Sequence, residues 1–154
     1  VEQMPYSDSS FDLIYSCWVI EHLENPSIFL NECHRVLKEN GKLILWSPNV
    51  FSFTNIMTKI ISNDFKIKFL SYFLNKVSDD VSHYEVYMRA NSVSDIDRLT
   101  RNKFRRTFLE RYDSPNYFKN NRFLTYCWFV RHKFSDNWMF NFVWPSFFVE
   151  YQKL

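Results

Sequence analysis

Two pairs of neighbouring side chains in this chain could move protons. Glu21 lies next to His22, and His83 lies next to Tyr84. Because an imidazole changes its charge near pH 6.5, a histidine beside a bound molecule can act as a general base or orient a reacting group. Both pairs could equally be structural, the first hydrogen-bonded within its loop and the second in a solvated turn. The residues alone leave both interpretations open.

The cysteines form no recognisable site. Cys17, Cys33 and Cys127 are odd in number and widely spaced, which fits neither a disulfide framework nor a zinc motif. We therefore expect reduced cysteines, a cytoplasmic location and no bound metal. The chain opens on polar residues, unlike a signal peptide, and no run approaches the ~18 apolar residues that a membrane-spanning helix needs.

The composition is that of one globular domain with two unusual features. Of the 154 residues, 20% are aromatic, and Gly41 is the single glycine. A glycine-rich phosphate or dinucleotide loop is therefore not encoded in this sequence. The net charge of +2 is too small to indicate nucleic-acid binding. The densest basic run could be an RNA-contacting face or an ordinary solvated face: Arg98, Arg101, Lys103, Arg105, Arg106 and Arg111.

The first fifty residues predict a strand, a helix and a second strand. Residues 11–17 form an apolar run without alternation, which indicates a strand buried on both faces. Asn25 and Pro26 predict the start of a helix, and Asn40-Gly41 predicts its end, with the glycine in the left-handed conformation. Residues 42–47 predict the second strand. Such a βαβ unit has parallel strands and a right-handed crossover.

The later part of the chain predicts further helices and two strands. Residues 51–76 carry two amphipathic helical patterns, and residues 117–132 carry another. Ser92 and Asp95 have capping-box spacing at the start of a helix that runs to Thr100, where Asn102 could replace glycine as the end signal. Strands are predicted over residues 104–112 and 146–153, while residues 138–144 are ambiguous between strand and loop.

Several linked motifs give this sequence a family resemblance. The segment Glu-Gln-Met-Pro-Tyr-Ser-Asp-Ser-Ser-Phe-Asp of residues 2–12, Glu-His-Leu of residues 21–23 and Arg-Val-Leu-Lys of residues 35–38 occur in order, followed by Asn-Gly-Lys-Leu at 40–43. This pattern resembles the S-adenosylmethionine-dependent methyltransferases of the type 11 small-molecule group. The match runs in register to about residue 49. A looser one continues through His83-Tyr84, the helix after Ser92 and the strands near Phe104 and residues 149–153, while residues 51–82 and 113–145 show no resemblance.

The resemblance implies an α/β fold: a Rossmann-like methyltransferase sheet from its fourth strand onward, with a helical insertion and an antiparallel final strand. It implies one partial domain, divided into an adenine loop and βαβ unit (1–50), a helical lid (51–82) and a helix–strand part (83–154). The family's glycine-rich loop and its ribose- and adenine-binding acids lie upstream of Val1. We therefore expect the later part of a longer, N-terminally truncated methyltransferase.

The resemblance also implies a cofactor, S-adenosylmethionine, and residues that contact it. An adenine wall would use backbone N–H groups and a methionine side chain, and the methionine end of the cofactor would lie near the end of the first strand. The adenine-wall residues are Glu2, Gln3 and Met4. The residues near the methionine end are Ser16, Cys17 and Trp18. The alternative for Met4 and Trp18 is ordinary packing.

The acceptor side is implied more weakly. His22 is the candidate catalytic base, and Asn49, His83 and Tyr84 are candidate substrate contacts. The apolar helices of residues 51–76 could cover an apolar acceptor, contact a membrane surface or simply pack in the core.

Three functions remain open after the sequence. The leading one is methyl transfer to a small or medium organic acceptor, with the chain inactive by itself. The second is a degenerate, non-catalytic Rossmann-like interaction module, and the third is an RNA methyltransferase. The sequence does not indicate an oligomeric state.

Overall fold

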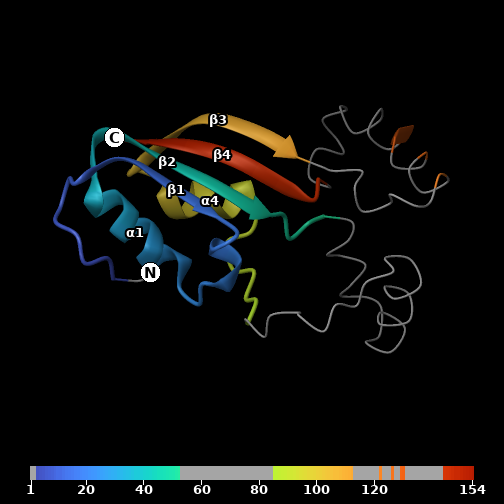
Figure 1. Cartoon of the computed structure of the whole chain (residues 1–154), viewed down its shortest axis with the longest axis horizontal. Coiled ribbons are helices and arrows are strands. Elements are labelled where there is room, and N and C mark those ends of the chain that lie inside the picture. Colours follow the sequence, from blue (N-terminus) through green and yellow to red (C-terminus); the bar gives the residue numbers. More distant parts are fainter. Residues whose placement is uncertain (1–2, 53–84, 113–121, 123–125, 127–128, 131–143) are drawn as a thin grey trace.

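The computed structural model describes residues 3–52, 85–112, 122, 126, 129–130 and 144–154, and all structural statements below concern these residues (Figure 1). They form one open sheet with the strand order β1-β2-β4-β3. β1 (Phe11–Cys17) and β2 (Leu37–Pro48) are parallel. β4 (Ser146–Lys153) is antiparallel both to β2 and to β3 (Phe104–Tyr112). The predicted antiparallel final strand is confirmed.

A helix connects the two parallel strands, as predicted. After β1 the chain makes a short 3-10 turn, η1 (Ile20–His22), and then α1 (Pro26–Val36). Pro26 occupies the first turn and Asn25 the N-cap position, although the Asn25 side chain makes no capping hydrogen bond. Proline suits this position because the first N–H groups of a helix have no intrahelical partner.

The predicted end of this helix was wrong. α1 ends at Val36 and β2 begins at Leu37, which is fully buried. Two carbonyls of the last turn, on Arg35 and Val36, accept the N–H groups of Ser9 and Ser10 at 3.0 and 2.7 Å. These bonds replace a glycine cap, because they satisfy carbonyls that the helix leaves without a partner.

Asn40, rather than Gly41, adopts the left-handed conformation, with φ 62°. Asparagine tolerates this region better than most residues. Gly41 is needed for a different reason, since a Cβ at this position would lie 2.8 Å from the carbonyl oxygen of Lys38.

One layer of helix covers one face of the sheet. α4 (Val93–Thr100) packs beside α1, and side chains from both helices join the buried face of β2 and β4. The predicted cap is confirmed, because the Ser92 hydroxyl accepts the N–H of Asp95 at 3.1 Å. Asn102 is left-handed as predicted, with φ 70°. The core consists mainly of Phe29, Leu30, Cys33, Val36, Leu43, Leu45, Ile96, Phe147, Val149 and Tyr151.

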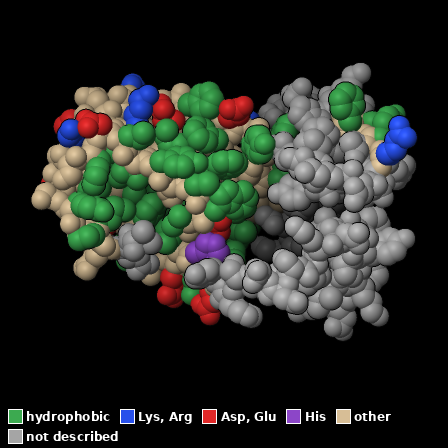
Figure 2. Space-filling view, viewed as in Figure 1, with side chains coloured by type: hydrophobic (Ala, Val, Ile, Leu, Met, Phe, Trp, Pro, Cys, Tyr) green, Lys and Arg blue, Asp and Glu red, His purple; other side chains and the backbone are tan. Residues whose placement is uncertain are grey.

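The other face of the sheet is apolar but has no covering helix among the described residues. Leu13 and Tyr15 of β1 are 52% and 54% exposed, and Phe108 of β3 is 48% exposed. Figure 2 shows hydrophobic side chains gathered over the sheet on this side. The prediction that β1 is buried on both faces was therefore wrong, since within the described sheet β1 is an edge strand with one open face.

Several predicted segments lie outside the described residues. They are the helices of residues 53–76, most of the helix of residues 117–132, and residues 138–143. Within the described part, no helix is long and apolar enough to cross a membrane.

Candidate functional site

The carboxyl ends of β1 and β2 lie side by side. Cys17 at the end of β1 is in register with Trp46 of β2, and the N–H of Trp18 donates to the Trp46 carbonyl oxygen at 2.9 Å. In open α/β sheets, ligands bind beyond the carboxyl ends of parallel strands. This edge is therefore a candidate binding site.

Trp18 has an unusual backbone conformation. Its φ is 55°, a left-handed conformation that costs free energy for a bulky residue. Its indole is 46% exposed and lies 6.3 Å from the ring of Trp46, which in turn packs edge-on against Tyr112 at 5.8 Å. The Nε1 of Trp46 is buried and makes no hydrogen bond. An aromatic surface thus forms beside the strand ends, next to the buried Ser16 and half-buried Cys17.

The loop that follows β1 is tied to residues 85–89. The ring Nδ1 of His22 and the carbonyl oxygen of Glu85 are 2.8 Å apart. The Glu21 carbonyl accepts the N–H groups of Tyr87 and Met88 at 2.8 and 3.1 Å. His22 therefore has a structural contact with a distant segment, and its N–H donates to the Val19 carbonyl within its own loop at 3.0 Å. Its proposed role as a base stays a prediction.

The Glu21 side chain is buried beside this histidine. Only 3% of the residue is exposed, and its Oε2 has no hydrogen-bond partner. Burial raises the pKa of this carboxyl group above its ordinary value, because a charged carboxylate is disfavoured away from water. The group therefore holds its proton to higher pH than an exposed glutamate does.

Asn49, just beyond β2, binds the segment that leads into β4. Its Nδ2 donates to the Trp144 carbonyl at 2.9 Å, its Oδ1 accepts the Phe51 N–H at 3.1 Å, and its own N–H donates to the Pro145 carbonyl at 2.8 Å. These bonds hold the start of β4 beside the end of β2. The predicted contact of Asn49 with a substrate is additional to this role and stays a prediction.

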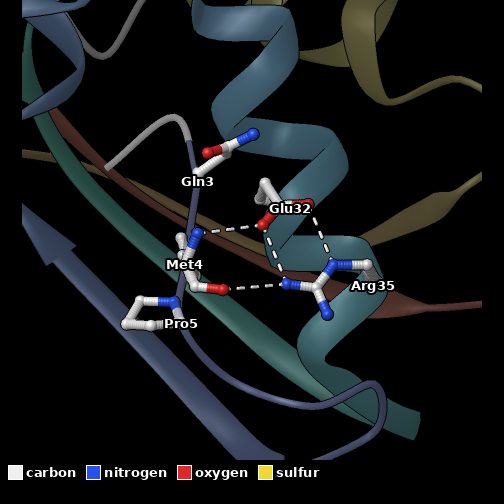
Figure 3. Close-up of a pocket in the computed structure, with 5 residues that line it drawn as sticks. All are labelled: Gln3, Met4, Pro5, Glu32 and Arg35. Carbon is white, nitrogen blue, oxygen red and sulfur yellow. Dashed lines mark hydrogen bonds and ion pairs between the residues drawn. The ribbon is translucent and has the colours of Figure 1, made fainter.

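A second place of interest is a recess between the N-terminal segment and α1. It has a volume of about 520 Å³ and is lined by Gln3, Met4, Pro5, Glu32 and Arg35 (Figure 3). The predicted adenine-wall residues Gln3 and Met4 therefore lie against α1. The N–H of Met4 is already engaged, since it donates to Glu32 Oε2 at 3.0 Å. It does not have the free donor that the adenine prediction assigned to it.

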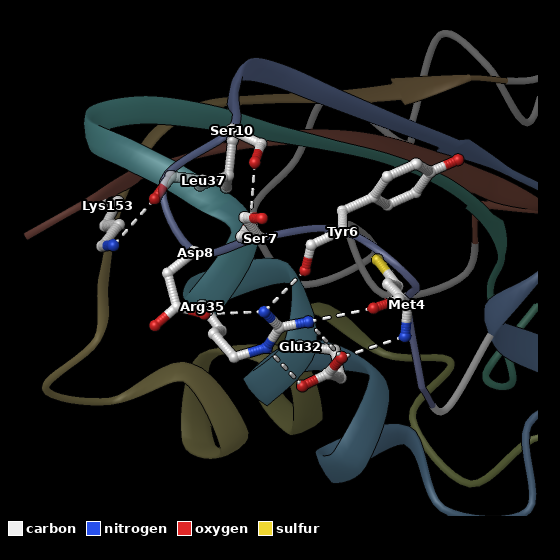
Figure 4. Close-up of polar contacts among 9 residues, drawn as sticks. All are labelled: Met4, Tyr6, Ser7, Asp8, Ser10, Glu32, Arg35, Leu37 and Lys153. Carbon is white, nitrogen blue, oxygen red and sulfur yellow. Dashed lines mark hydrogen bonds and ion pairs between the residues drawn. The ribbon is translucent and has the colours of Figure 1, made fainter.

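Glu32 and Arg35 hold this segment in place (Figure 4). The Arg35 guanidinium donates to the carbonyl oxygens of Met4 and Tyr6 at 3.1 and 2.8 Å, and to Asp8 Oδ1 at 2.7 Å. It also makes a two-point contact with Glu32, at 2.9 and 2.8 Å. The hydrogen bonds from Arg35, with that from Met4, lower the pKa of Glu32 to about 2. The carboxylate therefore keeps its charge over the whole physiological range.

The described cysteines lie in different surroundings and outside any metal-binding cluster. Among the described residues no cluster could hold a metal ion, and Cys17 and Cys33 are free. Burial raises the pKa of Cys33 to about 12, so this thiol is inert at neutral pH. Cys127 lies outside the described residues.

Apart from His22, the predicted site residues fall into three groups. Gln3 and Met4 line the recess, and Ser16, Cys17, Trp18 and Asn49 lie at or just beyond the carboxyl ends of β1 and β2. Glu2, His83 and Tyr84 lie outside the described residues. Sequence reasoning missed the contacts of Glu32 and Arg35. Their signal was an acid and an arginine three residues apart on a predicted helix.

Four of the six residues in the basic run have acidic or amide partners. Arg98 pairs with Asp95, and Arg106 pairs with Asp97 at 3.1 and 2.5 Å. Arg105 donates to the amide oxygen of Gln152, and Lys103 donates to that of Asn31. These contacts favour a solvated face over an RNA-contacting one.

The fold is similar to that of solved structures. The structural match with a solved SAM-dependent methyltransferase from Thermotoga maritima covers 99% of this chain and 59% of that chain, with a TM-score of 0.55 at 17% identity. A solved SAM-dependent methyltransferase from Methanosarcina mazei gives a TM-score of 0.53 at 16% identity, over 99% of this chain and 64% of that chain. The fold is that of the Rossmann-like methyltransferases, as predicted.

The family follows from the sequence of the first part of the chain. Residues 1–45 match the family model described as "Methyltransferase domain", so this segment is similar to that family. The Mycobacterium tuberculosis protein named "Probable S-adenosylmethionine-dependent methyltransferase Rv3030" is 38% identical over 52 residues, which are 34% of this chain and 19% of that protein. The predicted resemblance is confirmed. The matched segment spans about a fifth of the curated relatives that it matches first.

Proposed function

We propose that this chain is part of an S-adenosylmethionine-dependent methyltransferase that acts on a small or medium organic acceptor. The observation that carries the proposal is the family match of residues 1–45 on a parallel βαβ unit whose strand ends meet at Trp18 and Trp46. The cofactor would supply a methyl group on a sulfonium. The enzyme's part in such a displacement is mainly proximity and alignment.

In this proposal the described residues would form one side of the cofactor site. Gln3 and Met4 would form the adenine wall through their side chains, because the Met4 N–H is bound to Glu32. Ser16, Cys17 and the exposed indole of Trp18 would lie beside the methionine end. The glycine-rich loop of the opposite side has no counterpart in a sequence with one glycine, so residues 1–154 alone would bind the cofactor weakly or not at all.

On the acceptor side, His22 would orient the acceptor or remove its proton, with its ring fixed by the contact to Glu85. Burial raises the pKa of the neighbouring Glu21 carboxyl group. Asn49, His83 and Tyr84 would line the acceptor pocket. We further propose a cytoplasmic location, and the paired basic run argues against RNA as the acceptor.

Isothermal titration calorimetry tests the proposal on two proteins, the 154-residue chain and the full-length gene product that contains it. We expect the full-length protein to bind S-adenosylmethionine with a Kd in the range of about 1 μM to 1 mM that is common for enzyme substrates. We expect no measurable heat with the 154-residue chain alone. Transfer of a labelled methyl group to small-molecule extracts but not to RNA would support the acceptor class.

Two results would contradict the proposal. If the full-length gene product carries no glycine-rich loop and binds no S-adenosylmethionine, the chain is a non-catalytic interaction module. If the label enters structured RNA, and binding of that RNA falls steeply with salt as phosphate contacts require, the acceptor class is wrong.

A further inference from the structure

We propose that Glu32 and Arg35 are positioning residues for the cofactor site, and that they hold the adenine wall by clamping residues 4–8 to α1. The inference rests on the proposed function, because it assigns a role within the same site. Neither residue is placed in contact with the cofactor itself.

The two side chains bind both backbone groups of Met4. Glu32 Oε2 accepts the Met4 N–H at 3.0 Å, while Arg35 Nη2 donates to the Met4 carbonyl at 3.1 Å. With both backbone groups of Met4 bonded to the same helix, neither adjoining peptide plane can rotate without breaking a hydrogen bond. Figure 3 shows the two contacts converging on Met4 from α1. The direction of the Met4 side chain is set by this arrangement.

Arginine suits this role because its planar guanidinium offers five N–H donors in a fixed fork. Nη1 reaches the Tyr6 carbonyl and Asp8, Nη2 reaches the Met4 carbonyl, and Nε and Nη2 bind Glu32. Figure 4 shows these contacts fanning out from one guanidinium. A lysine at this position would place one compact ammonium where the structure uses three nitrogens.

The same helix also binds the next part of the segment through its backbone. The N–H groups of Ser9 and Ser10 donate to the carbonyls of Arg35 and Val36. These two bonds do not depend on the Arg35 side chain. They therefore provide an internal reference for any variant that releases only residues 4–8.

The chain offers a matched control on its other described helix. Asp95 and Arg98 form an acid–arginine pair with the same three-residue spacing on α4, and Arg98 is 70% exposed. Among the described residues, this pair forms no hydrogen bond or ion pair with the N-terminal segment. Removing the Arg98 charge has the same effect on net charge as removing that of Arg35.

The test compares Arg35→Met, Arg35→Lys and Glu32→Gln with Arg98→Met in the full-length protein. The first measurement is amide hydrogen exchange without ligand, read at Met4 and, as reference, at Ser9 and Ser10. The second is the Kd for S-adenosylmethionine by calorimetry, together with the melting temperature and the KM for the acceptor once one is known.

We expect Arg35→Met to speed exchange at Met4 but not at Ser9 or Ser10, and to weaken cofactor binding by about 10-fold or more, because pre-organisation of the site is lost. Arg35→Lys should not restore binding, because the fork geometry is lost although the charge is kept. Glu32→Gln should fall between Arg35→Met and the wild type, since its Oε1 can still accept the Met4 N–H. Arg98→Met should leave both measurements unchanged, and if Arg35→Met does not fold, Glu32→Gln carries the test.

The outcomes separate this inference from the proposed function. If the wild type binds the cofactor and Arg35→Met binds it equally well, the positioning role is wrong and the proposed function stands. Equal loss of affinity in Arg35→Met and Arg98→Met would also overturn it, since the cause would then be charge or stability. If the wild type does not bind the cofactor, both the proposed function and the positioning role fail.

Discussion

The effect of the ion pair between Glu32 and Arg35 depends on the other groups that the Arg35 guanidinium contacts. Exposed pairs contribute little to stability, because water and salt screen them and side-chain entropy opposes them. Arg35 differs from an ordinary surface arginine because its fork also binds two backbone carbonyls and Asp8. Its main effect is therefore on the path of the chain.

The pH dependence of this pair is a direct prediction. The pKa of Glu32 is about 2 in the folded chain, against an ordinary value of 4.5. The stabilisation from this depressed pKa is fully present above pH 4.5 and is lost as the pH falls from 4.5 towards 2. A ¹³C titration of the Glu32 carboxyl should show a midpoint near 2 in the wild type. In Arg35→Met the midpoint should move towards 4.5, and an unchanged midpoint would show that Arg35 is not the cause.

Residue types at the site could be predicted from the sequence, but their partners could not. His22 was recognised as a candidate from its imidazole, and both His22 and Asn49 from the family resemblance. Their partners, Glu85 and Trp144, are 63 and 95 residues away along the chain, and no local spacing indicates contacts at such separations.

At the scale of the element, α4 begins at the cap that its local sequence predicts. Ser92 caps the helix by accepting the Asp95 N–H, and its hydroxyl donates to Asp95 Oδ2 at 2.6 Å. The buried Ile96 and Thr100 face the core, and the Thr100 hydroxyl donates to the Ile96 carbonyl at 2.7 Å. A short helix of this kind depends on its cap because it has few internal hydrogen bonds.

We expect Ser92→Ala to lower the free energy of unfolding by about 1 kcal/mol, the usual effect of removing an N-cap side chain. Chemical denaturation of the two proteins measures this difference. Ser27→Ala is the control, since Ser27 lies at an exposed position of α1 and does not cap it. An equal loss in both variants, or none in Ser92→Ala, would contradict the assigned cap.

The elements of the βαβ unit could be predicted because their signals are local, namely a capping position, proline at the helix start and apolar runs of strand length. The end of α1 could not. It depends on Leu37 being buried against the sheet and on Ser9 and Ser10 supplying N–H groups from a segment far back along the chain. The Asn-Gly pair signals a left-handed residue but not which of the two adopts it.

At the scale of the whole molecule, the sheet has one covered and one open face among the described residues. Tyr15 and Phe108 belong to the same row across the sheet, through Ile44 and Glu150. Apolar patches of several hundred Å² on a monomer mark sites of contact or of aggregation. The burial of β1 could not be predicted from its sequence, because an apolar run does not reveal which neighbouring elements are present.

This open face should bind a hydrophobic dye in the 154-residue chain. We expect Tyr15→Lys to lower the fluorescence of bound anilinonaphthalene sulfonate and to reduce self-association in sedimentation velocity. Ile28→Lys introduces the same charge on α1, where Ile28 is 41% exposed, and should change neither measurement as much. Equal effects of the two substitutions would show that the sheet face is not the apolar surface responsible.

The central claim is that this chain supplies one wall of an S-adenosylmethionine site. Amide chemical-shift mapping of the full-length protein with S-adenosylhomocysteine tests it most directly, because it locates binding without requiring an acceptor. We predict that, within this chain, the largest shifts fall at Gln3 and Met4 and at Ser16, Cys17 and Trp18. Saturable binding that leaves these five residues unshifted, or the absence of any shift, would contradict the account.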